Sequence, residues 1–155
     1  MKNVVRQRFV IHEHHARNLH FDLRLEVGGV LKSWAVPKGV SMRAAEKHLA
    51  IAVPDHSLGY IDFEGHISEG SYGAGDVCIW DKGEYETDSD PNQQLKNGKV
   101  VLTFFGRKVR GRFVLIKVYG GEGQWLIIKT QDGFADPRWK LETILLSQSA
   151  LSQKI

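Results

Sequence analysis

The chain has 155 residues, 42% of them hydrophobic and 25% charged, with a formal net charge of +3, as expected for one globular domain over residues 1–155. Its single cysteine, Cys78, excludes an internal disulfide and a zinc site built from several cysteines. No apolar run approaches the ~20 residues of a membrane span and the N-terminus is too polar for a signal peptide, so we expect a cytoplasmic protein.

Short β-strands separated by glycine-rich turns are predicted along most of the chain. They cover residues 8–12, 19–27, 30–36, 48–53, 76–80, 84–86, 99–105, 112–118 and 125–130. A helical turn is expected at 41–46, a disorder-prone stretch at 87–97 and a helix over 137–151. This pattern predicts an all-β fold, a compact closed or nearly closed β-barrel of about eight strands with a short C-terminal helix. A small barrel without open edges is expected to be a monomer.

The predicted strand over residues 19–27 carries the most informative pattern. Apolar residues alternate strictly with His20, Asp22, Arg24 and Glu26. The period of two places these four side chains on one strand face, with neighbours about 6.5–7 Å apart. An imidazole, a carboxylate and a guanidinium in a row indicate a reaction surface rather than an ordinary solvated face.

Histidines also gather just before that strand. His12, His14 and His15 precede His20, and His14 follows another β-like run. A lone histidine is usually a surface or hydrogen-bonded core residue, but His14, His20 and Asp22 together make a three-point cation site with positions open to water or substrate. Such ligands suit Mn²⁺, Fe²⁺, Co²⁺ or Zn²⁺, and the residue types do not choose among them.

Three charged residues each allow two interpretations. Arg24 offers a donor fork that matches phosphate oxygens, or it forms an ion pair with Glu26 or a cross-strand acid. Glu26 orients a metal-bound histidine, or it is a solvated charge. Lys38 lies in a turn from which it could reach a phosphate, or it is an ordinary surface lysine.

Other catalytic classes lack their sequence signatures. The glycines of residues 70–75 do not follow the GxxxxGK[ST] pattern of a nucleotide-binding loop. No G-x-S-x-G motif is present, and Cys78 lies inside a predicted strand, so covalent catalysis is not expected.

Five motifs follow one another in order along the chain. They are His14-x5-His20-x-Asp22-x-Arg24-Leu-Glu26, Gly29-Val-Leu-Lys-Ser-Trp-Ala-Val-Pro-Lys-Gly39, Asp55-His56-x3-Tyr60-x2-Phe63-Glu-Gly65, Glu69-Gly-x-Tyr-Gly-Ala-Gly75 and Trp80-Asp-x-Gly83. Together they resemble the 3′-phosphoesterase module of bacterial DNA ligase D. The resemblance covers about residues 8–130 and leaves no room for ligase or primase-polymerase domains, so a stand-alone form of the module is expected.

This resemblance implies a barrel whose concave face holds one Mn²⁺ ion, with Co²⁺ or Zn²⁺ as alternatives. The implied metal ligands are His14, His20 and Asp22. Arg24, His56 and Tyr60 would lie near the scissile phosphate, with Lys38 helping to bind it. His56 is expected to act in the chemistry, by protonating the leaving oxygen or by hydrogen-bonding the phosphate, rather than in metal binding.

The implied activity is metal-dependent processing of DNA 3′ ends in repair by non-homologous end joining. A terminal 3′-ribonucleoside would be removed from a primer-template end by phosphodiester cleavage. The 3′-phosphate left behind would be removed next, leaving a 3′-OH. Separate ligase or polymerase subunits are the implied protein partners.

One position departs from the family pattern. His48 stands where an arginine that helps bind the phosphate usually precedes the Asp-His motif. Histidine lacks the bidentate fork and is mostly neutral at pH 7. We therefore expect weaker phosphate binding that improves as the pH falls, with the phosphomonoesterase step affected most.

Two other classes of protein stay open. A cupin-like Fe(II) oxygenase also holds two histidines and a carboxylate on a barrel, but would add a further ligand from a later strand and an apolar pocket. A non-catalytic nucleic-acid-binding β-barrel would show strong salt dependence and indifference to chelators. Arg24 and Lys38 favour an anionic substrate over the first class, and neither class explains the ordered motifs.

Overall fold

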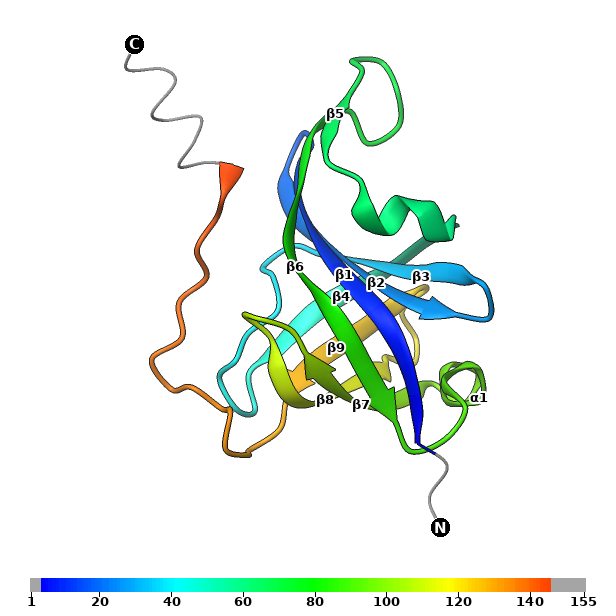
Figure 1. Cartoon of the computed structure of the whole chain (residues 1–155), viewed down its shortest axis with the longest axis vertical. Coiled ribbons are helices and arrows are strands. Elements are labelled where there is room, and N and C mark those ends of the chain that lie inside the picture. The colour runs from blue at the N-terminus through cyan, green and yellow to red at the C-terminus, as the bar shows by residue number, and fades with distance from the viewer. Residues whose placement is uncertain (1–3, 146–155) are drawn as a thin grey trace.

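The computed structural model describes residues 4–145 as a small β-barrel (Figure 1). Helical segments in this part of the chain are short: a 3₁₀ helix η1 (Leu58–Asp62) and a helix α1 (Pro91–Lys96). Neither is long and apolar enough to cross a membrane. The strands are β1 (Val5–His15), β2 (Leu19–Val27), β3 (Val30–Val36), β4 (Lys47–His56), β5 (Gly65–Ile67), β6 (Gly75–Thr87), β7 (Lys99–Phe105), β8 (Arg110–Lys117) and β9 (Gln124–Lys129).

Antiparallel pairing closes eight strands into a ring. Neighbours follow the order β1-β2-β3-β4-β9-β8-β7-β6, and the pairing of β6 with β1 completes the barrel. The short strand β5 adds to β6 beside the start of that strand, at Gly75–Val77. The all-β class and the closed barrel of about eight strands are therefore confirmed.

The alternation of β2 separates a core face from a polar face. Phe21, Leu23 and Leu25 point into the barrel and are at most 1% exposed, as part of a core that also contains Phe9, Ile11, Phe104 and Phe113. Burying a side chain of this size stabilises the fold by about 1.5–3 kcal/mol. Asp22 and Arg24 point the other way.

The polar face of β2 is also covered. On that outer side, Val10, Leu31 and Ile61 form a second, smaller apolar cluster, against which Leu58 and Tyr60 pack. This cluster holds η1 against the outside of β1 and β3. The segment from η1 to the β5–β6 loop thereby shields a polar sheet face from solvent, and the candidate site lies beneath it.

Strand β6 is longer than the sequence predicted. The expected strands at 76–80 and 84–86 are one strand, interrupted by a bulge where Ile11 pairs with Asp81 and His12 with Ile79. Trp80, the unpaired residue, is 2% exposed and packs edge-on against Phe21 with ring centroids 5.7 Å apart. A bulge of this kind bends a strand without ending it.

Two local predictions are wrong. At 41–46 the Ser41 hydroxyl does accept from the Arg43 N–H, but no helical turn forms, because Ala44 bridges to Lys129 and Ala45 has a positive φ of 66°. The stretch 87–97 contains α1, where Asp90 caps the helix by accepting from the Asn92 N–H and Pro91 occupies the first turn.

The C-terminal segment also differs from its prediction. Residues 137–144 are not helical; they run along the barrel, and the remainder of the predicted helix, 146–151, lies outside the described residues. Partners on the barrel bind the backbone instead: Arg43 donates to the Trp139 carbonyl and Trp80 to the Glu142 carbonyl, each at 2.8 Å. These contacts replace the intrahelical hydrogen bonds that the spacing predicted.

Candidate active site

A pocket of about 500 Å³ opens on the outer face of β1–β4. Its wall includes residues from η1 and from the β5–β6 loop, segments far from β2 in the sequence. Six of the residues predicted from the sequence line it: His14, His20, Asp22, Arg24, His56 and Tyr60. The fold therefore gathers most of the predicted site in one place.

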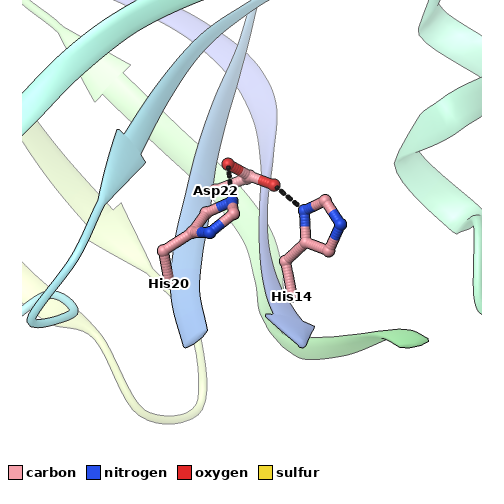
Figure 2. Close-up of side chains that lie close together, drawn as sticks. All are labelled: His14, His20 and Asp22. Atoms are coloured by element: carbon pink, nitrogen blue, oxygen red, sulfur yellow. Dashed lines mark hydrogen bonds and ion pairs between the residues drawn. The ribbon is translucent and has the colours of Figure 1, made fainter. Parts of the chain in front are cut away.

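One end of the pocket joins two imidazoles to one carboxylate (Figure 2). The Nδ1 atom of His14 lies 2.9 Å from Oδ2 of Asp22, and the Nε2 atom of His20 lies 3.1 Å from Oδ1. His14 lies opposite His20 in the β1–β2 pair, and Asp22 is two residues further along β2 on the same face. Strand pairing and alternation together bring the three side chains into contact.

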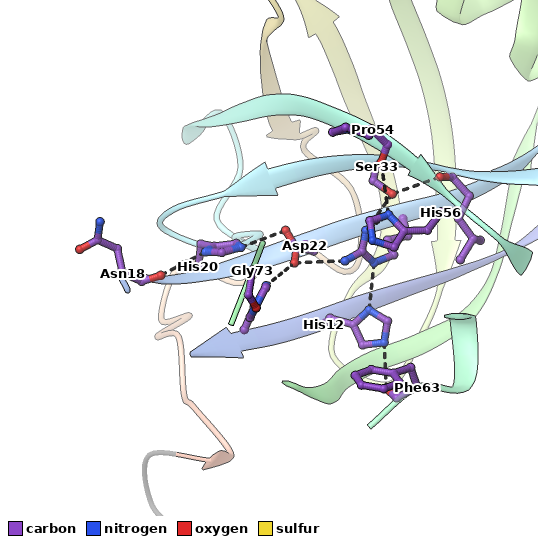
Figure 3. A network of polar contacts seen from close by, with 12 residues as sticks. His12, Asn18, His20, Asp22, Ser33, Pro54, His56, Phe63 and Gly73 are labelled. Carbon is purple, nitrogen blue, oxygen red and sulfur yellow. Dashed lines mark hydrogen bonds and ion pairs between the residues drawn. The ribbon is translucent and has the colours of Figure 1, made fainter. Parts of the chain in front are cut away.

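Backbone carbonyls fix the other ring nitrogens of both histidines (Figure 3). Nε2 of His14 lies 2.6 Å from the Gly73 carbonyl, and Nδ1 of His20 lies 3.1 Å from the Asn18 carbonyl. Since a carbonyl only accepts, each of these nitrogens carries the hydrogen. The ring nitrogens that face Asp22 therefore bind the carboxylate through a proton, or direct a lone pair at a cation that takes the place of that proton.

This geometry fits a divalent cation. The ligand atoms of His14, His20 and Asp22 all lie within 4.8 Å of one another. Outer nitrogens anchored by carbonyls are also the usual support of metal-binding histidines, since they fix the tautomer and the ring orientation. The donor set of two imidazoles and one carboxylate suits Mn²⁺, Fe²⁺, Co²⁺ or Zn²⁺.

The same three groups shift one another's protonation. Burial alone would raise the pKa of Asp22, but hydrogen bonds with His14 and His20 and the charge of Arg24 outweigh it and lower that pKa. Burial alone would lower the pKa of His20, but its hydrogen bond with Asp22 and the Asp22 charge raise it. The carboxylate is therefore ionised and attracts positive charge to this end of the pocket.

Arg24 dominates the other end and is 3% exposed. Its Nε donates to Nδ1 of His12 at 3.0 Å, and its Nη2 to Oδ2 of Asp22 at 3.2 Å. Its Nη1 donates to Ser33 Oγ at 2.9 Å and to Nδ1 of His56 at 3.0 Å. These contacts hold the guanidinium plane rigidly beside the cation site.

His12 is the residue that sequence reasoning missed. It accepts from Arg24 through Nδ1, and its Nε2 lies 3.1 Å from the Phe63 carbonyl, so its single hydrogen is on Nε2 (Figure 3). Burial and the Arg24 charge lower the pKa of His12 to about 3, so it is neutral. The sequence did contain a signal for this role: His12 lies two residues before His14 on one strand, so both side chains share a face.

His56 and Tyr60 complete this end of the pocket. Nδ1 of His56 lies 3.0 Å from Nη1 of Arg24, which can only donate, and 3.2 Å from the Pro54 carbonyl, which can only accept, so a neutral ring makes one of these two hydrogen bonds at a time. Burial and the Arg24 charge both lower the pKa of His56. Phe63 stacks on the Tyr60 ring at 4.7 Å between centroids, and Arg24 lies over the same ring at 4.9 Å.

Three predicted site residues lie outside the pocket lining. Lys38 is exposed in the turn after β3. His48 uses both ring nitrogens, on the Gly39 carbonyl at 2.5 Å and the Glu46 carboxylate at 2.8 Å. Glu26 accepts from the backbone and side chain of Arg8 rather than orienting a histidine, a task that the carbonyls of Asn18 and Gly73 perform. Phosphate binding by Lys38 and His48 stays a prediction.

Comparisons with known proteins show the family of this chain. A family model described as the DNA Ligase D 3′-phosphoesterase domain matches residues 12–117. The multifunctional non-homologous end joining protein LigD of Pseudomonas aeruginosa is 46% identical over 130 residues, which are 83% of this chain and 16% of that protein. The corresponding protein of Mycolicibacterium smegmatis is 46% identical over 131 residues, 81% of this chain and 17% of that protein.

The relation extends to the multifunctional non-homologous end joining DNA repair protein LigD of Mycobacterium tuberculosis. It is 48% identical over 121 residues, 76% of this chain and 15% of that protein. The chain thus spans about one sixth of the length of these relatives. Since the family match covers both ends of the pocket, from His12 through Gly73, the chain belongs to the DNA ligase D 3′-phosphoesterase domain family.

Proposed function

We propose that this protein is a metal-dependent hydrolase that processes DNA 3′ ends. It removes a terminal 3′-ribonucleoside from a primer-template and then the remaining 3′-phosphate, so that a 3′-OH is left for end joining. The observation that carries the proposal is the joining of a cation site and a buried guanidinium through one carboxylate, Asp22. A metal ion and a guanidinium placed close together can both stabilise the negative charge that develops in phosphoryl transfer.

Three residues would hold the metal. His14, His20 and Asp22 offer one ligand atom each, and we propose Mn²⁺ as the ion, with Co²⁺ or Zn²⁺ as alternatives. When bound, such an ion stabilises negative charge on phosphoryl oxygens and makes a coordinated water more acidic.

Arg24 contributes a cation that cannot move away from the phosphate. Four of its five N–H groups bind His12, Ser33, His56 and Asp22 within the described part of the chain. The fifth, on Nη2 beside Asp22, is the one available to a phosphate oxygen. Because the side chain is already ordered, binding costs little conformational entropy.

His56 contributes a hydrogen-bond donor rather than an acid. Its pKa is lowered by burial and by Arg24, so at pH 7 the ring is neutral. We infer the tautomer in which Nδ1 accepts from Arg24 at 3.0 Å, the shorter of its contacts with Arg24 and with the Pro54 carbonyl. Nε2–H is then the group that His56 can offer to a phosphate oxygen in the pocket. We infer that it binds the phosphate or the leaving oxygen and that the leaving group takes its proton from solvent.

A labelled primer-template that ends in one 3′-ribonucleotide tests the proposal. Incubation with Mn²⁺ should shorten the primer by one nucleoside and then remove the phosphate, and EDTA should abolish both steps. The matched control is the same primer with a 3′-deoxynucleotide end, which should be processed far more slowly. No product with any divalent metal would refute the proposal. Separate ligase or polymerase subunits, the proposed partners, are not needed for this assay.

A further inference from the structure

We propose that the pocket contains a nucleobase subsite, formed by Tyr72 with Ile67 and Ala16, on which the base of the 3′-terminal nucleotide stacks. The inference rests on the proposed function, because it assigns the part of the DNA end that lies beyond the scissile phosphate. All three residues line the pocket that holds the metal and phosphate groups.

Tyr72 is the aromatic side chain of the pocket lining whose ring is open to a ligand. The other lining tyrosine, Tyr60, has its ring covered by Phe63 and Arg24. Tyr72, in contrast, is 86% exposed. An exposed aromatic ring at the rim of a polar pocket offers a stacking surface, which is how proteins hold unpaired bases.

The β5–β6 loop contacts the cation site through Gly73, the residue that follows Tyr72. The carbonyl of the next residue, Gly73, accepts from Nε2 of His14 at 2.6 Å. A Cβ atom at Gly73 would lie 3.2 Å from Cε1 of that ring, so the loop backbone lies directly against the imidazole. A base on Tyr72 would therefore adjoin the metal ligands rather than a distant surface.

Ile67 and Ala16 lie at the same end of the pocket. Ile67 pairs with Gly75 at the end of β5, and a Cβ atom at Gly75 would clash with the His15 carbonyl and approach Cα of Ala16 at 3.1 Å. The loop thus closes against the β1–β2 turn. These two apolar side chains suit an uncharged base and not a phosphate.

The terminal base is the one that this surface fits. Bases inside the duplex already stack on their neighbours, whereas the last base has one open face. Stacking on an aromatic ring tolerates every base, since each has a π-face. The subsite is therefore expected to bind the terminal nucleoside without selecting its sequence.

A double-mutant cycle tests the subsite. Wild type and Tyr72→Ala are compared on primers that end in a normal 3′-ribonucleotide, in an abasic 3′-ribose, or with the abasic position one nucleotide earlier. Tyr72→Phe keeps the ring. Tyr119→Ala is the matched control, because Tyr119 is 85% exposed on another glycine-rich turn and does not line the pocket.

Tyr72→Ala should lower kcat/KM on the normal end by about 5- to 150-fold, the equivalent of one base–aromatic stack. It should change nothing on the abasic end, while Tyr72→Phe and Tyr119→Ala match wild type on all three primers. Equal losses on the normal and terminally abasic ends, or no loss on either, would overturn the subsite. So would a loss that disappears only when the penultimate base is removed.

A binding measurement separates the subsite from the proposed activity. In EDTA, wild type should quench the fluorescence of a 3′-terminal 2-aminopurine ribonucleotide, and Tyr72→Ala should not. Quenching without cleavage under any metal would refute the phosphoesterase proposal and support the base contact. Cleavage without quenching would do the reverse.

Discussion

The two ends of the pocket use histidine in opposite electrostatic environments. At one end, Asp22 faces His14 and His20, and although burial alone would lower the pKa of His20, the carboxylate raises it. At the other end, burial and the charge of Arg24 lower the pKa of His12 and of His56, to about 3 for His12. Asp22 and Arg24 are two residues apart on β2, so histidines close together on this sheet face lie beside opposite charges.

The difference shows how one strand face can hold two kinds of positive charge without mutual repulsion. Rings near Asp22 present lone pairs to a place where a cation can replace protons. Rings near Arg24 stay neutral, so that they can accept its hydrogen bonds. The contact of 3.2 Å between Asp22 and Arg24 joins the two ends.

Asp22→Asn should have the largest effect, because it removes the charge that both ends share. We expect at least a 100-fold loss of Mn²⁺ affinity, more than loss of a supporting hydrogen bond costs, and a loss of phosphoesterase activity at least as large. Titration calorimetry with Mn²⁺ measures the first, and primer cleavage measures the second. Wild-type Mn²⁺ affinity in this variant would show that the carboxylate is not a ligand.

Arg24→Lys should separate the two ends. An ammonium group cannot reach His12, Ser33 and His56 together, so the ordered phosphate donor is lost and turnover should fall about 100- to 1000-fold. Mn²⁺ affinity should stay within about threefold of wild type, because the metal ligands remain, a margin well below the cost of losing a supporting partner. If calorimetry shows metal affinity falling as far as turnover, the two ends are one unit.

His12 variants should affect stability more than chemistry. His12→Leu leaves the Arg24 Nε–H and the Phe63 carbonyl without partners and should lower the free energy of unfolding by about 1–3 kcal/mol. His12→Gln carries both an acceptor and a donor and should cost less than His12→Leu. Urea unfolding of the metal-free proteins compares them. Equal stability of the leucine variant and wild type would contradict the assigned hydrogen bonds.

The smallest effect concerns the titration of His56. Burial and Arg24 hold its folded-state pKa below the usual 6.5, so its neutral form favours folding above pH 6.5. That contribution is lost as the pH falls through the lowered pKa. The imidazole Cε1–H resonance, assigned by its absence in His56→Gln, should titrate with a midpoint below 6.5 in metal-free protein. A midpoint above 6.5 would place an unrecognised carboxylate beside the ring.

Much of this site could be predicted from β2 alone, because a period of two determines which side chains share a face. His20, Asp22 and Arg24 lie together for that reason. The supporting contacts could not be predicted, since they come from the backbone carbonyls of Gly73 and Asn18, which any residue type supplies.

Contacts between segments that are distant in the sequence could not be predicted either. His12 was left without a role because its partner is the carbonyl of Phe63, 51 residues away. The spacing over residues 137–151 predicts a helix, yet donors and acceptors on the barrel bind residues 139–145 in another conformation. Periodicity describes one segment at a time and contains no information about such partners.

Glu13 determines how far the chain can be shortened. Its side chain is fully buried, and its carboxylate accepts from the backbone N–H groups of Ile144 and Leu145 at 2.7 Å each. A fragment that ends with the family match at residue 117 would lack β9 and leave this carboxylate without those donors. The smallest fragment expected to fold therefore extends through Leu145, well past the boundary that similarity alone would choose for recombinant expression.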